Sequence, residues 1–515
     1  MKQYETFELR FQGEALTENY ANIPLDATFT CDGKTTAVKG FYDGDGQYVA
    51  RFFPEQAGEY HWAVSGCIAA EGNESCEEAA EDAHGLVKAV DTHFEFEDGK
   101  LYIPFGTTVY ALAHQDDDLT EQTLATLKTA PFNKLRMCVF PKDYDYNHNE
   151  PPCYAFEKKA NGSWDVSRPC IAFWQRFETI LDRITAMGIQ VDLILFDPYD
   201  RWGFDTLSQR ENLVYLDYLL RRLAAKPGIW WSLANEYDLS RGKSLADWEE
   251  IEEFVAAHDP YGHLLSCHNC ICFWDASRPN ITHASLQVKG LSAVPRWLER
   301  YGKPVMIDEC CYEGDLPHFW GSISAREMVN RFWRSCAGGG YCTHGETFLD
   351  DREVLWWAKG GVLKGKSPRR IAFLREIMES LPGPLQPAEG GMIQLMQMSD
   401  SEVQEVLKPL PEAERSIASE IVKSARRMDA CDREILLSGE HEYASHCDEE
   451  AYLWFNDLQC LGIQTLQLPK DKQYRVECID TWEMTRLLVA DKASGTTTIR
   501  LPVKEGLAVL ATRIQ

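Results

Sequence analysis

Residues 229–238 read IWWSLANEYD, and this stretch decides the fold. It opens with a short, largely apolar run, which is the pattern of a parallel strand with both faces buried. The run ends at a polar pair, Asn235 and Glu236. In a barrel of parallel strands, the side chains that follow the strand ends project into the active-site bowl. The stretch therefore predicts a barrel strand that carries functional groups at its end.

Similar runs recur between residues 93 and 385, and longer amphipathic segments, such as 173–188, 211–225 and 244–258, alternate with them. Eight strands alternating with helices predict an α/β fold, a (β/α)₈ TIM barrel. No Gly-rich phosphate loop follows the first strand, which argues against an open, doubly wound sheet. The expected strands are 101–112, 134–141, 189–196, 229–234, 264–268, 281–287, 304–309 and 340–346.

The segments that flank the barrel alternate apolar and polar residues, as the strands of β-domains do. Turn-forming DGDG at 43–46 separates such bursts near the N-terminus, and the acidic stretch 69–85 is expected to be a solvated loop. Prolines and glycines at 381–391 mark the end of the barrel. The expected domains are an N-terminal β-sandwich (1–90), the catalytic barrel (93–385), a helical connection (386–434) and a C-terminal, sandwich-like β-domain (435–515).

The composition of this 515-residue chain limits the classes of partner that it can bind. The chain has 80 acidic and 52 basic residues and a net charge of −28. Such a charge repels nucleic acids and anionic membranes, so we expect neither as a partner. The N-terminal residues lack the apolar run of a signal peptide, and no segment is long enough to span a bilayer. The 17 cysteines lack the spacing of a secreted disulfide scaffold. These features predict a cytoplasmic protein with reduced thiols.

Two glutamates carry the most specific signal for chemistry. Glu236 ends the fourth expected strand, and Glu309 ends the seventh, within PVMIDECCYEG at 304–314. In a barrel these carboxylates face each other across the bowl, where such a pair can act as general acid/base and nucleophile on a glycosidic bond. Asn235 can hold the sugar hydroxyl next to the anomeric carbon. Arg136, on the second strand, can keep Glu309 ionised.

This arrangement resembles the clan A glycoside hydrolases, retaining (β/α)₈ enzymes in which an Asn-Glu pair ends the fourth strand and a Glu ends the seventh. The resemblance covers residues 93–385. The sequence RFFPEQAGEYHW at 51–62 is similar to the sandwich that precedes the barrel in an apiosidase-like subgroup. The resemblance implies that Glu236 is the acid/base and Glu309 the nucleophile, with Asn235 and Arg136 beside them.

Further side chains that end or follow an expected strand are candidates for substrate binding. His114 and Gln115 could instead cap the helix that follows the first strand, and Asp197 and Asp200 are expected to set a turn. A tryptophan at this rim could offer a flat face to a sugar ring. The candidates are His114, Gln115, Trp202, His268, His344 and Glu346.

The sequence CHNCIC at 267–272 raises the question of a metal site. Zinc sites usually take paired ligands from two separated segments, whereas a strand would turn Cys270 and Cys272 to one face and Ile271 to the other. Buried small side chains are the simpler interpretation, and no metal is expected. A metal-dependent barrel hydrolase that uses these cysteines and nearby histidines stays an alternative.

Together these features predict an exo-acting, retaining O-glycosyl hydrolase of small glycosides or oligosaccharides that needs no cofactor. The exo prediction rests on a cytoplasmic location, where only imported small glycosides are met. It also rests on the long loop 142–169, which can wall off one side of the bowl. A carbohydrate-binding protein with an inactive barrel is the alternative from another class, and transglycosylation is a variation within the leading one. The oligomeric state stays open, with a homo-oligomer as one option.

Overall fold

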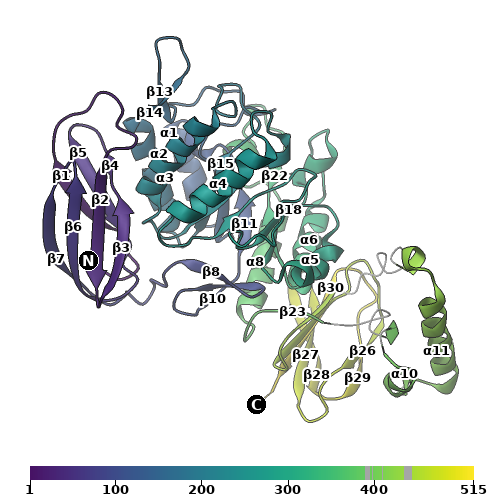
Figure 1. Cartoon of the computed structure of the whole chain (residues 1–515). Coiled ribbons are helices and arrows are strands. Elements are labelled where there is room, and N and C mark those ends of the chain that lie inside the picture. The colour runs from purple at the N-terminus through teal and green to yellow at the C-terminus, as the bar shows by residue number, and fades with distance from the viewer. Residues whose placement is uncertain (389–394, 397, 409, 434–442, 515) are drawn as a thin grey trace. The chain divides into compact units, whose positions relative to one another are not determined.

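The computed structural model describes residues 1–388, 395–396, 398–408, 410–433 and 443–514 (Figure 1). They form two compact units. The first holds Met1–Lys289, Leu298–Ala325 and Tyr341–Pro368, and the second holds Gly290–Trp297, Arg326–Gly340 and Arg369–Gln515. Among the described residues, no helix combines the length and the apolar character that a membrane crossing requires.

The eight expected strands form one parallel sheet, which confirms the (β/α)₈ prediction. Neighbours follow the order β17-β16-β15-β12-β11-β21-β19-β18. Where β17 and β18 meet, Thr282 donates to the Leu265 carbonyl at 2.9 Å, and the Asn269 side chain bonds the backbone of Gln287 at 3.1 and 3.3 Å. The strands are β11 (Phe105–Thr108), β12 (Lys134–Cys138), β15 (Gln190–Phe196), β16 (Ile229–Ala234), β17 (Leu265–Ser266), β18 (Ala284–Gln287), β19 (Val305–Glu309) and β21 (Tyr341–His344).

The stretch 101–112, predicted as one strand, is divided at Pro104, which has no N–H to donate to a ladder. Its first part, β10 (Leu101–Tyr102), joins β9 (His93–Phe96) and β8 (Val87–Val90) in a separate antiparallel sheet. From β9, the Phe94 ring packs 5.1 Å from Trp230 and 5.3 Å from Tyr341. Both partners lie near the starts of their strands, so this sheet packs at the end of the barrel opposite the strand ends.

The helices begin where the sequence supplies caps. Ser208 and Glu211 form a capping box at the start of α3, and Ser244 and Asp247 form another at the start of α4. In Figure 1, α3 and α4 lie side by side. The helices of the barrel region are α1 (Asp117–Leu127), α2 (Ile171–Thr185), α3 (Gln209–Leu223), α4 (Leu245–His258), α5 (Val294–Tyr301), α6 (Ala325–Ala337), α7 (Trp356–Lys359) and α8 (Ser367–Glu379), with 3₁₀ turns η1 (Leu112–His114), η2 (Tyr237–Leu239), η3 (Leu291–Ala293) and η4 (Phe319–Gly321).

The N-terminal residues form two antiparallel sheets, β1-β5-β4 and β3-β2-β6-β7. Phe29 and Phe52, one from each sheet, stack with centroids 4.1 Å apart. The expectation of a loop at 69–85 was wrong for β7, since this edge strand pairs with β6 and leaves its acidic side chains to solvent. The strands are β1 (Phe7–Gln12), β2 (Leu25–Cys31), β3 (Lys34–Lys39), β4 (Phe41–Tyr42), β5 (Gln47–Phe52), β6 (Gly58–Gly66) and β7 (Ala70–Cys76).

The second unit has its own apolar core. Leu466 and Ile499 of the β26-β29 pair share a core cluster with Tyr474 and Val509 of a six-stranded sheet. Residues 389–394, 397, 409, 434–442 and 515, which belong to the predicted helical connection and C-terminal domain, lie outside the described residues. Beyond residue 385, the described elements of this unit are β23 (Gln386–Pro387), α10 (Asp400–Leu407), α11 (Glu412–Arg427), β24 (Tyr443–Cys447), β25 (Ala451–Phe455), β26 (Ile463–Gln467), β27 (Tyr474–Asp480), β28 (Thr485–Ala493), β29 (Thr496–Arg500) and β30 (Leu507–Arg513).

The remaining short strands follow barrel strands. β13 (Phe156–Lys158) and β14 (Trp164–Pro169) form a hairpin in the long loop after β12, and β20 (Glu313–Gly314) pairs with β22 (Glu346–Thr347) beyond β19 and β21.

Candidate active site

Glu236 is the second residue after β16 and has a left-handed backbone conformation, with φ 46° and ψ 54°. Such a conformation is uncommon for a residue with a side chain, and it often marks a functional site. The Glu236 residue is 6% exposed. The hydroxyl of Tyr199 donates to its Oε2, and Nδ2 of Asn235 donates to the same oxygen at 3.3 Å. The carboxylate is therefore oriented by two neutral donors.

Glu309 ends β19, and its side chain is 12% exposed. The hydroxyl of Tyr110 donates to its Oε1, and Nη1 of Arg136 lies 3.6 Å from the same oxygen. Burial and the nearby Glu236 raise the pKa of Glu309, and Arg136, Lys142 and Tyr110 only partly oppose this rise. Glu309 is thus a buried carboxylate close to Glu236. The two cations and the phenol beside it favour its ionised form.

Asn235, Tyr110 and Arg136 join the two glutamates in one network. Oδ1 of Asn235 lies 3.2 Å from the Tyr110 hydroxyl and accepts from Nη2 of Arg136 at 3.3 Å. Burial, Glu236, Asp238 and Glu309, in this order of effect, raise the pKa of the Cys270 thiol to about 12. Glu236 and Glu309 are therefore connected through Asn235, Tyr110 and Arg136.

A fully buried layer of charge supports Arg136 from within the barrel. Nζ of Lys134 donates to Asp192 at 2.6 Å and to Asp308 at 2.7 Å, and Nε of Arg136 lies 3.5 Å from Asp192. Although burial would raise the pKa of Asp308, Lys134 and Arg136 hold it well below its usual range. Two cations thus balance two carboxylates, and Arg136 keeps a rigid position beneath Glu309.

Aromatic rings gather beside this network. Tyr144 lies 4.8 Å from Tyr199, and Trp357 lies 6.0 Å from Tyr110. Trp320, which is half-buried, lies 5.2 Å from Trp357. These rings resemble the flat apolar surfaces on which sugar rings stack.

His268 is brought to the two glutamates. Its Nδ1 accepts the backbone N–H of Glu236 at 3.4 Å, and its Nε2 lies 4.0 Å from Oε1 of Glu309. Burial and Arg136 hold the pKa of His268 well below its usual value, so the ring is neutral. Because Nδ1 accepts, the proton lies on Nε2, on the side of Glu309.

The structure places His114 and Gln115 in hydrogen bonds around η1. Nε2 of His114 donates to the Val139 carbonyl at 3.1 Å, and burial lowers the pKa of this histidine to about 4. The Gln115 amide donates to the Ala111 carbonyl at 2.9 Å and to Oδ1 of Asn147 at 3.2 Å. Both side chains are buried, and their contacts tie the long loop after β12 to the end of β11.

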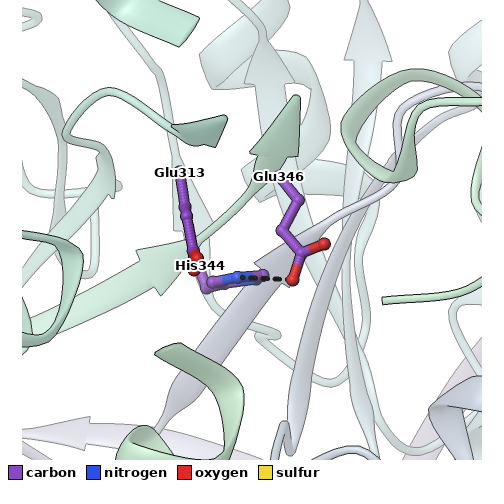
Figure 2. A group of neighbouring side chains, drawn as sticks. All are labelled: Glu313, His344 and Glu346. Carbon is purple, nitrogen blue, oxygen red and sulfur yellow. Dashed lines mark ion pairs between the residues drawn. The ribbon is translucent and has the colours of Figure 1, made fainter. Parts of the chain in front are cut away.

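His344 and Glu346 lie in a buried cluster with Glu313, shown in Figure 2. Nε2 of His344 is 3.6 Å from Oε1 of Glu346. All four carboxylate oxygens accept backbone N–H groups: Glu346 from Lys364 and Gly365 at 2.7 and 3.0 Å, and Glu313 from Lys366 and Ser367 at 2.8 and 3.1 Å. The carboxylates thus anchor the segment 364–367.

Trp202 lies half-buried in the turn after β15. Its indole donates to Glu150 at 2.9 Å, and the guanidinium of Arg201 lies 4.8 Å from its ring centroid. Asp200 accepts the backbone N–H groups of Trp202 and Asp205, both at 2.8 Å, so it sets the turn as the sequence predicts.

The CHNCIC segment is held by Asp238, whose carboxylate accepts the N–H groups of Cys270, Ile271 and Cys272 at 2.6 to 2.8 Å. Cys267 is buried and Cys272 exposed. Within the described part of the chain, these cysteines belong to no group of three side chains that could hold one metal ion.

Tyr110, Tyr199 and Lys142 contact this network and are among the residues that the sequence-based candidates omit. Tyr110 follows β11, Tyr199 follows β15 and Lys142 follows β12, so the strand-end argument applies to them as well. A search of strand ends for phenols and lysines, as well as for acids and histidines, would have found them.

Comparison with known families places the chain among sugar-cleaving proteins. Residues 90–380 match the family model described as "Apiosidase-like, catalytic domain". Two models described as domains of unknown function, DUF5060 and DUF5605, match residues 1–66 and 440–514.

Among solved structures, the chain is similar to a "putative glycoside hydrolase" from Bacteroides vulgatus ATCC 8482, with 32% identity and a TM-score of 0.84 over 100% of this chain and 99% of that one. A glycoside hydrolase family 5 structure from the same organism shares the fold, with 14% identity and a TM-score of 0.58 over 83% of this chain and 94% of that one. No protein with a curated description matches the chain.

Proposed function

This chain belongs to the apiosidase-like family of glycoside hydrolases, and we propose that it cleaves glycosidic bonds with retention of configuration through Glu236 and Glu309. It is a glycosidase with the barrel of the clan A enzymes. One observation supports the catalytic pair above all others: Asn235, Tyr110 and Arg136 connect both carboxylates in a single network at the strand ends.

In the first step, Glu309 attacks the anomeric carbon while Glu236 gives its proton to the departing oxygen. Arg136 and the Tyr110 hydroxyl stabilise the ionised Glu309 before attack. In the second step, the Glu236 carboxylate takes a proton from water, which releases the sugar from Glu309. No cofactor takes part in either step.

Asn235 and neutral His268 are proposed to hold sugar hydroxyls. Asn235 lies between the glutamates, and the Nε2 proton of His268 lies on the side of Glu309. Trp320 is a better stacking surface than Trp202, because its ring packs near Trp357 and Tyr312 whereas Trp202 bonds Glu150. His344 and Glu346 are buried in the cluster with Glu313, where Glu346 anchors the segment 364–367.

The substrates we propose are small glycosides or oligosaccharides, cleaved from one end. The loop 142–169 contains the β13-β14 hairpin and leads from Lys142, which lies beside the site. A cytoplasmic location fits the cysteines: all 17 lie in the described part of the chain, and none of them forms a disulfide there.

The test uses a panel of 4-nitrophenyl pyranosides and furanosides that includes pentoses and deoxy sugars. On the sugar that the chain cleaves fastest, we expect Glu236→Gln and Glu309→Gln to lower turnover by about 10³-fold or more while far-UV circular dichroism stays unchanged. Near-normal turnover in either variant would refute the assignment. Binding of sugars without release of nitrophenol by the wild type would favour a binding protein with an inactive barrel.

A further inference from the structure

Lys142 is a buried cation surrounded by aromatic rings. The residue is 4% exposed, and its Nζ lies 3.7 Å from the ring centroid of Tyr110 and 4.3 Å from that of Tyr199. The rings of Trp357 and Tyr144 follow at 5.6 and 5.8 Å. These distances are those of cation–π contacts, which gain strength when the cation is removed from water.

The two nearest rings are the phenols that hydrogen-bond the catalytic pair. Tyr110 donates to Glu309, and Tyr199 donates to Glu236. One ammonium group therefore contacts both side chains through which the carboxylates are oriented. No other cation in the described part of the chain lies over both rings.

The ammonium is not held as buried lysines usually are. Its nearest carboxylate oxygen, Oδ2 of Asp197, is 3.8 Å away, beyond hydrogen-bond distance. Lys134, by contrast, donates to two carboxylates at 2.6 and 2.7 Å. Burying an ammonium without such hydrogen bonds costs free energy, and the contacts of Lys142 with the ring faces offset part of this cost.

Building on the proposed function, we propose that Lys142 is a positioning residue: its charge, set between Tyr110 and Tyr199, fixes both phenols against Glu309 and Glu236. A cation over a ring face draws electron density from the phenol and makes its O–H a stronger donor. Loss of the cation would loosen both donors together. We therefore expect the chemical steps to slow, while substrate binding changes little.

The charge of Lys142 also acts on Glu309 directly, because it lowers the pKa that burial and Glu236 raise. Removing the charge should shift the acid limb of kcat/KM to higher pH, since Glu309 then loses its proton at higher pH. The other titratable or charged groups that face Glu309 are Glu236, Arg136, His268, Tyr110, Tyr144, Tyr199, Cys270 and Tyr312.

The main variants are Lys142→Met, which keeps an unbranched apolar stem, and Lys142→Arg, which keeps the charge. The matched control is Lys243→Met: Lys243 is also buried and lies 4.6 Å from the Phe196 centroid, but it donates to Asp205 and contacts neither catalytic glutamate. We expect Lys142→Met to lower kcat by about 10-fold or more, with KM within about 3-fold and the acid limb moved upward. Lys243→Met should lose thermal stability without moving the acid limb.

Chemical rescue gives a readout that a purely structural role would not move. In Lys142→Ala, propylammonium can enter the space between the rings, and we expect it to restore part of kcat where equimolar propanol does not. A Lys142→Met variant with normal kcat and an unmoved acid limb would overturn the proposal, as would equal rescue by propanol. Should Lys142→Met not fold, the rescue of Lys142→Ala decides, because rescue by propylammonium no greater than that by propanol contradicts the proposal.

The same assays include Glu236→Gln and Glu309→Gln. If these two variants stay active, the proposed function fails. If they lose activity while the Lys142 variants keep it, only the role of Lys142 fails.

Discussion

The hydroxyl of Tyr199 donates a hydrogen bond to Oε2 of Glu236, so a phenol at the end of β15 orients the proposed acid/base at the end of β16. The ring of Tyr199 lies over the ammonium of Lys142, which also contacts Tyr110. A single group of aromatic side chains thus connects the cation with both carboxylates. The effects of changing these residues should therefore be coupled.

Tyr199→Phe keeps the ring but removes the donor to Glu236. We expect kcat to fall by about 10-fold or more for alkyl leaving groups, because a less well oriented acid delivers its proton less often. For dinitrophenyl leaving groups, which need little protonation, the first step should slow less. Steady-state and pre-steady-state rates on the two substrates make the comparison, and an equal loss on both would contradict this role for Tyr199.

Glu309→Gln should stabilise the fold at neutral pH. Because the pKa of Glu309 is raised in the folded state, its contribution to stability is present below the unfolded pKa and is lost as pH rises through the folded value. Removing the ionised carboxylate should therefore raise the free energy of unfolding at pH 7, with little gain near pH 4. Urea unfolding at both pH values measures this change in the free energy of unfolding. A variant that is less stable than the wild type at pH 7 would contradict the prediction.

Glu178 of α2 holds Arg51 of the N-terminal sandwich at 2.7 Å and Arg222 of α3 at 2.5 Å. Burial would raise its pKa, but these arginines lower it to about 2. We expect Glu178→Gln to cost about 3 kcal/mol at pH 7, since two buried cations lose their shared partner. With a lowered pKa, this stability is present above the unfolded pKa and is lost as pH falls toward 2, so the deficit of the variant should shrink in acid.

The control for Glu178 is Glu121→Gln, which breaks the exposed pair with Arg183. It should cost much less than Glu178→Gln, because solvent screens an exposed ion pair. Equal losses from the two substitutions, measured by urea unfolding, would show that the buried pair contributes no more than a surface one.

Gly365→Ala tests the anchor shown in Figure 2. A Cβ at this position would lie 2.5 Å from Oε2 of Glu313 and 2.5 Å from Oε1 of Glu346, both buried and hydrogen-bonded. We expect a loss of about 2 kcal/mol or more in thermal or urea unfolding. Gly290→Ala, with nothing within 4 Å of the added carbon, should be close to neutral.

EDTA should leave the melting temperature of the wild-type protein unchanged. A clear drop in that temperature would indicate a bound cation instead.

The barrel was predictable because its strands are buried on both faces and therefore read as apolar runs. Every residue of β15 and β16 is buried, and the predicted bounds of β16 agree with the structure. The first strand was placed too early, since an apolar pattern alone does not separate β10 from β11. Pro104, between them, was the signal for that division.

The positions of the two glutamates could be predicted because they follow from the strand ends. The direction in which neighbouring side chains point does not follow from the strand ends. His114 lies four residues after Tyr110, yet only Tyr110 contacts Glu309. The backbone turns into η1 after Ala111, which gives His114 a contact with Val139 instead. His268, Asn235 and Arg136 could be placed because they lie on or directly after strands, where the alternation of side chains is regular.

The most direct test of the catalytic pair is covalent trapping with a 2-deoxy-2-fluoro glycosyl fluoride of the sugar that the chain prefers. Mass spectrometry of the peptic digest should show one glycosyl adduct on the peptide that contains Glu309, and none in Glu309→Gln. Proton NMR of the first-formed product should show the anomeric configuration of the substrate. An adduct on another residue, or a product of inverted configuration, would contradict the account.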